Sequence, residues 1–149
     1  MQTIGMDFQY LDHTADLEFI AYGKSLGECF ENAGHALFSA ILGAGKEEIM
    51  EMGGKEVKEI ELKAPELEIL LHDWLAELLF LFDVDRMAFT YFTVEISGNG
   101  EYTLTASANY EPFDPDRHRI QTEVKAVTYH NMEIKQEGGL YTARVVCDI

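Results

Sequence analysis

Two stretches of the chain place apolar residues at spacings of three and four, which is the period of an amphipathic helix. The first stretch begins at Ser25, with Glu28 three residues later, and this is the pattern of a capping box. Gly43 and Gly45 follow the stretch and suit the end of a helix. The sequence therefore predicts a helix between Ser25 and Gly43, with an apolar face made of Leu26, Cys29, Phe30, Ala33, Leu37, Phe38 and Ile41.

The second helical stretch begins after Pro65, where Glu66 and Glu68 lie favourably near the positive end of a helix dipole. Its apolar stripe is broad, which predicts a helix packed against a sheet rather than one lying on the surface. Trp74 is accordingly expected in the core rather than in a cofactor pocket. The stripe consists of Leu67, Leu70, Leu71, Trp74, Leu75, Leu78, Leu79 and Phe82.

The remaining apolar segments are short, alternate with polar residues and are bounded by turn residues, as strands are. Asn99-Gly100 and Gly138-Gly139 each separate two such segments and indicate hairpin turns. The predicted strands are Phe8–Leu11, Leu17–Tyr22, Glu56–Leu62, Met87–Ile96, Tyr102–Ala108, Thr122–Thr128, Met132–Gln136 and Leu140–Asp148.

This order of elements predicts an α+β fold, with a mostly antiparallel or mixed sheet packed against two main helices. The chain has 149 residues and no segment that resembles a linker, so we expect a single domain over residues 1–149. Glu111–Arg119 contains two prolines and five charged residues between two predicted strands. This segment is expected to be an exposed loop, either a partner contact or a plain connector.

The charge composition limits the classes of function that the chain can have. The formal net charge is −16, from 27 acidic and 11 basic residues. Because nucleic-acid binding depends on cations that neutralise phosphates, autonomous RNA or DNA binding is not expected. Such a surface suits a basic protein partner or a divalent cation, although most of these carboxylates are expected simply to be solvated.

The two cysteines and the lack of a visible secretion signal favour the cytoplasm. Cys29 and Cys147 lie among apolar residues and predict buried thiols rather than a disulfide or a zinc site. No secretion signal is visible at Met1–Asp7, and no apolar stretch reaches the roughly 20 residues that cross a bilayer. We therefore expect a cytoplasmic protein without a membrane association.

Two carboxylates stand where a strand meets polar sequence. Asp16 opens directly into an apolar strand, and a carboxylate at the edge of a core requires a cation, a metal or backbone donors. Alternation places Asp148 on the same face of the last predicted strand as Arg144 and Val146, and the terminal carboxylate of Ile149 follows it. These residues are candidates for an acidic ion site.

The neighbouring candidates are less distinctive. Asp12 and Thr14 suit backbone hydrogen bonds within a turn, with His13 between them. Lys125 is either an ordinary strand lysine or a partner of an acid. The histidines have no HxH or HxxxH spacing, so an all-oxygen ion such as calcium or magnesium is favoured over zinc. No phosphate-binding loop or GxSxG motif is present.

Four separated motifs, in order from about residue 8 to the last residue, resemble the archease family. The opening one is Asp12-His13-Thr14-Ala15-Asp16 followed by Gly23-Lys24-Ser25-Leu26, and the last is Asp148-Ile149. Between them, LEILLHDWLAELL at Leu67–Leu79 resembles the second helix of the family, and EVKAVTYH at Glu123–His130 resembles another of its signatures.

This resemblance implies a non-catalytic activator of the tRNA-splicing RNA ligase. That ligase joins RNA ends by using GTP and a divalent metal through a guanylylated histidine of its own, and archease speeds formation of this intermediate and permits multiple turnover. By resemblance, the metal ligands fall on Asp16, Asp148 and the terminal carboxylate of Ile149, and the functionally important lysine falls on Lys125. Calcium is the expected ion, with magnesium or manganese as alternatives.

Two other functions stay open at this point. A metal-dependent enzyme that acts on a nucleotide would use the same two aspartates, although no general base or nucleophile pairs with them in the sequence. A general chaperone or scaffold would instead require exposed apolar surface. GTP is expected as the substrate of the partner ligase, and direct binding of GTP by this chain is left open.

Overall fold

The computed structural model describes residues 6–11 and 16–149, which form three helices and seven strands. In chain order the elements are β1 (Phe8–Leu11), β2 (Asp16–Gly23), α1 (Leu26–Leu42), α2 (Lys46–Glu51), β3 (Glu56–Ala64), α3 (Leu67–Asp85), β4 (Met87–Gly98), β5 (Tyr102–Pro112), β6 (Ala126–Glu137) and β7 (Leu140–Asp148).

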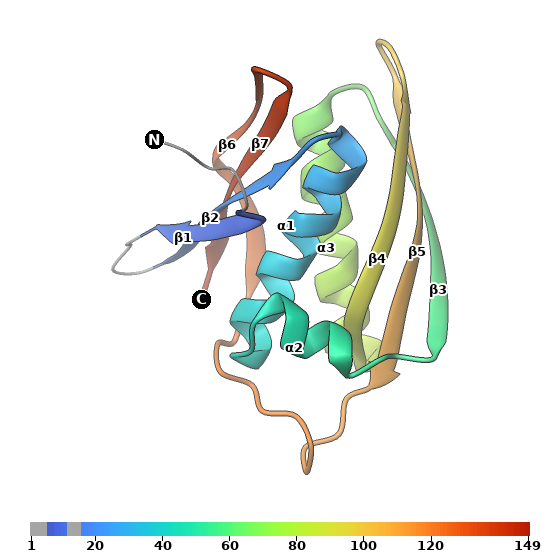
Figure 1. Cartoon of the computed structure of the whole chain (residues 1–149), viewed down its shortest axis with the longest axis vertical. Helices are drawn as coiled ribbons and strands as arrows, with labels where there is room; N and C mark the ends of the chain where they lie inside the picture. The colour runs from blue at the N-terminus through green and yellow to red at the C-terminus, as the bar shows by residue number, and fades with distance from the viewer. Residues whose placement is uncertain (1–5, 12–15) are drawn as a thin grey trace.

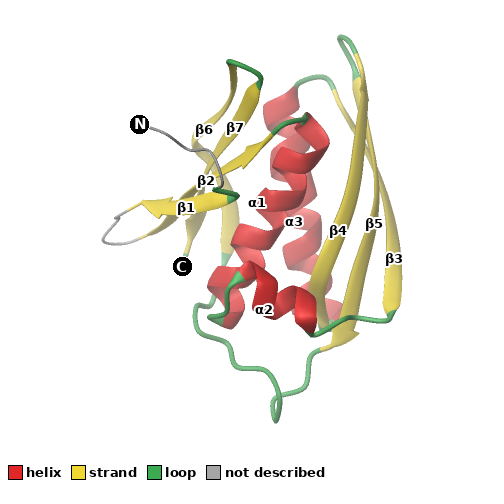
Figure 2. Cartoon of the chain, viewed as in Figure 1, coloured by secondary structure: helices red, strands yellow, loops and turns green. Residues whose placement is uncertain are grey.

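The strands form two antiparallel sheets with the helices between them. One sheet has the order β1-β2-β7-β6 and the other β3-β5-β4. Helices α1 and α3 lie side by side between the sheets, as Figures 1 and 2 show. The predicted α+β class is therefore confirmed, with two separate sheets where one was expected. The reason lies in α3, whose buried residues surround the helix and need cover on more than one side.

The first predicted helix is confirmed as α1, together with its caps. The Ser25 Oγ accepts a hydrogen bond of 3.1 Å from the Glu28 amide. The Glu28 carboxylate in turn accepts one of 2.7 Å from the amide of Lys24, one residue earlier than a standard capping box requires. The helix ends at Gly43, which adopts the left-handed conformation with φ 66°.

The second predicted helix is confirmed as α3, and Trp74 lies in the hydrophobic core between the sheets. Its indole ring is fully buried and makes an edge-on contact with Phe92. The indole Nε1 donates a hydrogen bond of 3.0 Å to the carbonyl of Phe30 on α1. This bond links the two central helices. The prediction that Trp74 lies in the core is confirmed.

Two elements differ from the prediction. The short helix α2 was not predicted, because it buries a single residue, Ile49, and so shows no apolar period. The two strands expected around residue 130 are one strand, β6, with a wide bulge in which residues 129–132 oppose Val145 alone. Asn131 adopts a positive φ of 54° in this bulge. The segment from Thr122 to Lys125 precedes the strand rather than belonging to it.

The segment predicted as an exposed loop is only partly exposed. Glu111 belongs to β5, whereas His118 is 6% exposed. The His118 Nδ1 accepts a hydrogen bond of 2.8 Å from the Asp114 amide, which leaves Nε2 to donate to Glu111 over 2.6 Å. These two bonds and the Phe113 ring stacked on the imidazole allow a histidine to be buried in a loop.

The remaining structural expectations concern the thiols and membrane spans. Cys29 and Cys147 are buried and unpaired, as predicted, and burial raises the pKa of each thiol to about 12. Within residues 6–11 and 16–149, no helix combines the length and apolar character that crossing a bilayer requires.

Candidate functional site

Asp16 and Asp148 are directly opposite each other where β2 begins and β7 ends. They are paired residues in the antiparallel register of these strands, which puts their Cα atoms about 4.5–5.5 Å apart. Because paired residues project from the same face of a sheet, both side chains lie on the face turned away from the helices. Asp16 is half-buried and Asp148 is exposed.

The start of β6 lies beside this pair on the other edge of β7. Ala126 is the paired residue of Asp148 in β6. The amide of Lys125 donates a hydrogen bond of 2.8 Å to the carbonyl of Asp148, and the Lys125 side chain is exposed. Three segments far apart in sequence therefore meet at one end of the four-stranded sheet.

Of the other predicted site residues, the structure describes only Ile149. Ile149 follows Asp148 directly and is 44% exposed, so its terminal carboxylate lies one residue beyond the aspartate pair. Asp12, His13 and Thr14 lie outside the described residues.

The predicted donors suit a hard cation. Two carboxylates opposite each other on neighbouring strands repel, and a cation between them relieves this repulsion. Asp16, Asp148 and the terminal carboxylate offer only oxygen atoms, the ligands that calcium and magnesium prefer. Among the described residues, histidine, cysteine, aspartate and glutamate side chains form no metal-like group of three or more. Any site here therefore needs the terminal carboxylate or further ligands in addition to the two aspartates.

An ion pair with one buried partner lies next to the aspartates on the same face of the sheet and was not predicted. The Glu18 side chain is 3% exposed and the Arg144 side chain is 41% exposed, and Arg144 Nε donates to the Glu18 carboxylate over 2.5 Å. Glu18 is paired with Val146, two positions along from the Asp16–Asp148 pair. The signal in the sequence was a glutamate inside the apolar run Leu17–Ile20, on the same face as Arg144.

We expect Arg144→Gln to lower the free energy of unfolding by about 1–3 kcal/mol, because the buried carboxylate of Glu18 loses a charge-assisted hydrogen bond. Urea denaturation followed by circular dichroism measures the effect. Lys135→Gln is the control, since the Lys135–Glu133 pair lies on the same sheet with both side chains about half exposed, and we expect a change of at most about 0.5 kcal/mol. Equal effects of the two substitutions would contradict a structural role for the Glu18–Arg144 pair.

A second unpredicted contact fixes the start of β6 against α3. His72 contacts the carbonyl of Val127 through Nε2 at 3.1 Å, and its ring stacks on Tyr129 at a centroid distance of 4.1 Å. Tyr129 remains 54% exposed. An exposed aromatic ring therefore lies in the strand that begins next to Asp148.

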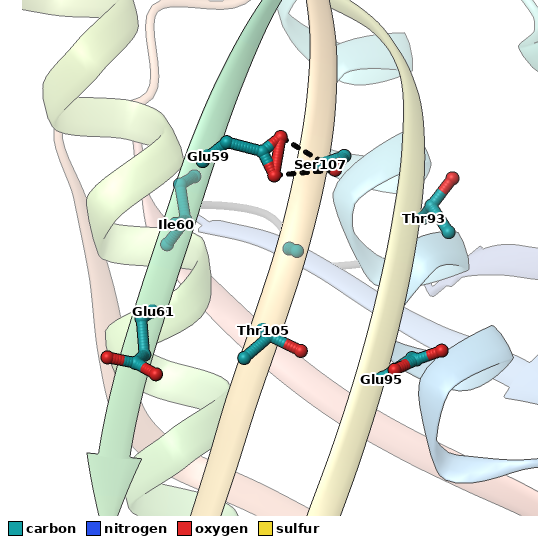
Figure 3. A pocket seen from close by; sticks show the side chains of 8 residues that line it. Glu59, Ile60, Glu61, Thr93, Glu95, Thr105 and Ser107 are labelled. Carbon is teal, nitrogen blue, oxygen red and sulfur yellow. Dashed lines mark hydrogen bonds between the residues drawn. The ribbon is translucent and has the colours of Figure 1, made fainter.

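The outer face of the other sheet carries a shallow acidic hollow of about 430 Å³. Figure 3 shows Glu59 and Glu61 on β3, Glu95 on β4, and hydroxyl side chains on β5 between them. The Ser107 hydroxyl lies 2.8 and 2.7 Å from the two carboxylate oxygens of Glu59. None of the predicted site residues lines this hollow, and it agrees with the expectation of a solvated acidic face.

Sequence comparison finds relatives along the whole chain. The model of the archease protein family matches residues 8–149. Protein archease of Methanosarcina barkeri is 46% identical over 151 aligned residues, and that of Methanosarcina acetivorans is 44% identical, with all of each chain covered in both cases. Protein archease of Sulfolobus acidocaldarius is 43% identical and covers 95% of this chain and 98% of its own.

Two solved structures are similar in fold. The solution structure of Methanobacterium thermoautotrophicum protein 1598 has a TM-score of 0.82 and 38% identity, and it covers 96% of this chain and 99% of its own. The crystal structure of an archease from Thermotoga maritima, described as a "possible chaperone", has a TM-score of 0.56 and 22% identity. It covers 93% of this chain and 94% of its own. At that identity, the second structure supports the fold alone.

Proposed function

The chain belongs to the archease family, and on this basis we propose that it is an accessory protein that activates the RNA ligase of tRNA splicing. The observation that supports a specific site is the register of β2 and β7, which puts Asp16 opposite Asp148 at the end of the chain. The amide of Lys125 binds the same residue, Asp148. The residues singled out by family resemblance thus lie at one end of one sheet.

In this proposal the site contributes ligands and charge, while the ligase performs the chemistry. Asp16, Asp148 and the terminal carboxylate of Ile149 hold a divalent cation, with calcium favoured and magnesium or manganese as alternatives. Lys125 offsets the negative charge of the cluster or contacts a phosphate as a point charge. This end of the sheet enters the active centre of the ligase and promotes guanylylation of its histidine by GTP.

Asp16→Asn tests this proposal in a single-turnover guanylylation assay of the cognate ligase. We expect the stimulated rate to fall about 10–100-fold, because the substitution keeps the shape of the side chain and removes a ligand charge. Glu95→Gln is the control: it removes one charge from the outer face of the other sheet and should leave the stimulation unchanged. A rate with Asp16→Asn equal to the parent rate would rule out the site.

A general chaperone and a metal-dependent enzyme are the other two functions that the sequence leaves open. The same assay separates them from ligase activation. A chaperone would suppress aggregation of unrelated unfolded proteins and leave the guanylylation rate of a folded ligase unchanged. A metal-dependent enzyme would instead turn over a nucleotide with no ligase present.

A further inference from the structure

A cavity of about 400 Å³ lies between the end of α3 and the segment that leads into β6. Its size falls in the range of small-molecule sites in proteins. Apolar residues of α1 and α3 form one part of the wall. Its charged lining consists of Asp83, Arg86, Glu123 and Lys125.

Arg86 has an unusual backbone conformation at this cavity. It caps the C-terminus of α3 in the left-handed region with φ 57°, a position that glycine fills most easily. Its amide donates to the carbonyl of Phe82 over 3.1 Å, and its carbonyl accepts from the amide of Phe113 over 2.7 Å. Non-glycine residues held in such conformations cluster at functional sites. Here the conformation places a guanidinium group in the cavity wall.

Arg86 and Lys125 are the two cations of the cavity lining, and both side chains are exposed. No hydrogen bond or salt bridge found within the described part of the chain involves the side chain of Arg86 or Lys125, whereas Lys46 and Arg144 each bind a carboxylate. Other basic side chains in that part of the chain also lack such a partner, but these two line one cavity. They offer several N–H donors to an oxyanion.

The two carboxylates of the lining, Asp83 and Glu123, are in the same cavity wall as these cations. Burial raises the pKa of Asp83, while Arg86 lowers it and Glu123 raises it further. Such a wall suits a ligand that carries both signs of charge. A phosphate chain with a bound divalent ion is one, because magnesium in proteins is commonly held by one or two carboxylates together with phosphate oxygens.

We propose that this cavity binds a polyphosphate that carries a divalent cation, with its phosphate oxygens on Arg86 and Lys125 and its metal beside Asp83 and Glu123. The bound metal also reduces the repulsion between a polyphosphate and the acidic surface. The inference goes beyond ligase activation and does not depend on it, although both use Lys125.

Calorimetric titration with magnesium pyrophosphate, with no ligase present, tests the inference. We expect saturable binding to the parent protein, and amide NMR shifts around residues 83–86 and 120–125. Pyrophosphate with a chelator, and magnesium alone, should each bind at least about tenfold more weakly. Pyrophosphate alone contacts only the two cations of the lining, and magnesium alone contacts only the two carboxylates. Comparing GTP with ATP shows whether a base adds to the phosphate contacts.

Arg86→Gly is the decisive variant, because glycine suits the left-handed conformation and the fold is therefore expected to retain its melting temperature. We expect this variant, and Lys125→Gln, to weaken binding of magnesium pyrophosphate about tenfold or more. Glu123→Gln should remove the advantage that magnesium confers. Arg119→Gln is the matched control, since Arg119 is exposed and lies outside the cavity lining.

Three outcomes would overturn the inference. The first is no binding at millimolar magnesium pyrophosphate. The second is equal weakening by Arg86→Gly and Arg119→Gln, which would indicate nonspecific charge. The third is binding that is independent of magnesium, which would refute the role of the carboxylates. Because no ligase is present, each outcome is distinct from a failure of the guanylylation assay.

Discussion

Replacing Trp74 with alanine should lower the free energy of unfolding by about 3–5 kcal/mol. The indole is fully buried, so its removal leaves a cavity between α1, α3 and β4 that the surrounding side chains fill only in part. The substitution also removes the hydrogen bond from Nε1 to the carbonyl of Phe30. Domains of this size are commonly stable by about 5–15 kcal/mol, so the loss is a large share of the total.

The measurement is urea denaturation followed by far-UV circular dichroism, because Trp74 is the single tryptophan of the chain and its fluorescence disappears with it. Phe80→Ala is the matched control, since Phe80 lies on the same helix and is 55% exposed. We expect that substitution to change stability by no more than about 0.5 kcal/mol. If both substitutions had the same effect, α3 would not pack between the two sheets as described.

Stability should also fall as the pH is lowered from about 6.5, because of one buried histidine. His35 on α1 is 2% exposed, packs edge-on against Phe92, and its Nδ1 makes no hydrogen bond within the described residues. Burial lowers the pKa of His35 to about 4, with Lys46 lowering it further and Asp7 opposing this. A charged imidazole in this position would have no partner to replace water.

The sign of this change in stability with pH follows from proton binding to His35. Below pH 6.5 the unfolded chain protonates His35, while the folded protein does so only near pH 4, so acid favours unfolding. The stability that results from this difference in the pKa of His35 is fully present above pH 6.5 and is lost as the pH falls. Each pH unit between the two pKa values corresponds to about 1.36 kcal/mol, so the loss approaches about 3 kcal/mol near pH 4.

Comparison of the parent with His35→Leu at pH 7.0 and pH 5.0 isolates this effect, since the carboxylates titrate in both proteins. Both values lie above the sequence pI of about 4.5, where solubility is lowest. We expect the stability of the parent relative to the variant to fall by about 2 kcal/mol between the two pH values. His130→Gln, at an exposed position of the β6 bulge, should behave like the parent. A difference that is the same at both pH values would show that His35 titrates normally in the folded protein.

Local signals predicted most of the secondary structure. Ser25 and Gly43 mark the ends of α1, because a cap acts through hydrogen bonds and dihedral angles within a few residues. The predicted hairpin turns are also present, between β4 and β5 and between β6 and β7. The helix α2 was not predicted, because its six residues bury one side chain and therefore show no helical spacing of apolar residues.

The individual residues of the candidate site could be predicted from the sequence, but their positions relative to one another could not. Asp16 and Asp148 each stand out as an acid at the end of an apolar strand. Their pairing depends on the order and register of β2 and β7, which are more than 100 residues apart in the chain. A shift of one residue in that register would put the two side chains on opposite faces of the sheet.

Several tertiary contacts had no clear local signal. Glu18 and Arg144 form an ion pair only because β2 and β7 are neighbours. His118 is buried because its two ring nitrogens are satisfied by Asp114 and Glu111, a geometry that composition does not reveal. The position of Arg86 beside Lys125 likewise depends on how the segment before β6 packs against α3.

The sequence by itself determined the two long helices, most strands and turns, the burial of both cysteines and the residues that carry family resemblance. These properties depend on the period of apolar side chains and on contacts between residues close in the chain. Tertiary structure alone decided the two-sheet arrangement, the pairing of Asp16 with Asp148 and the cavity between Arg86 and Lys125. Those features are contacts between distant segments, and their formation depends on the free energy of the whole packed core rather than on any short stretch of sequence.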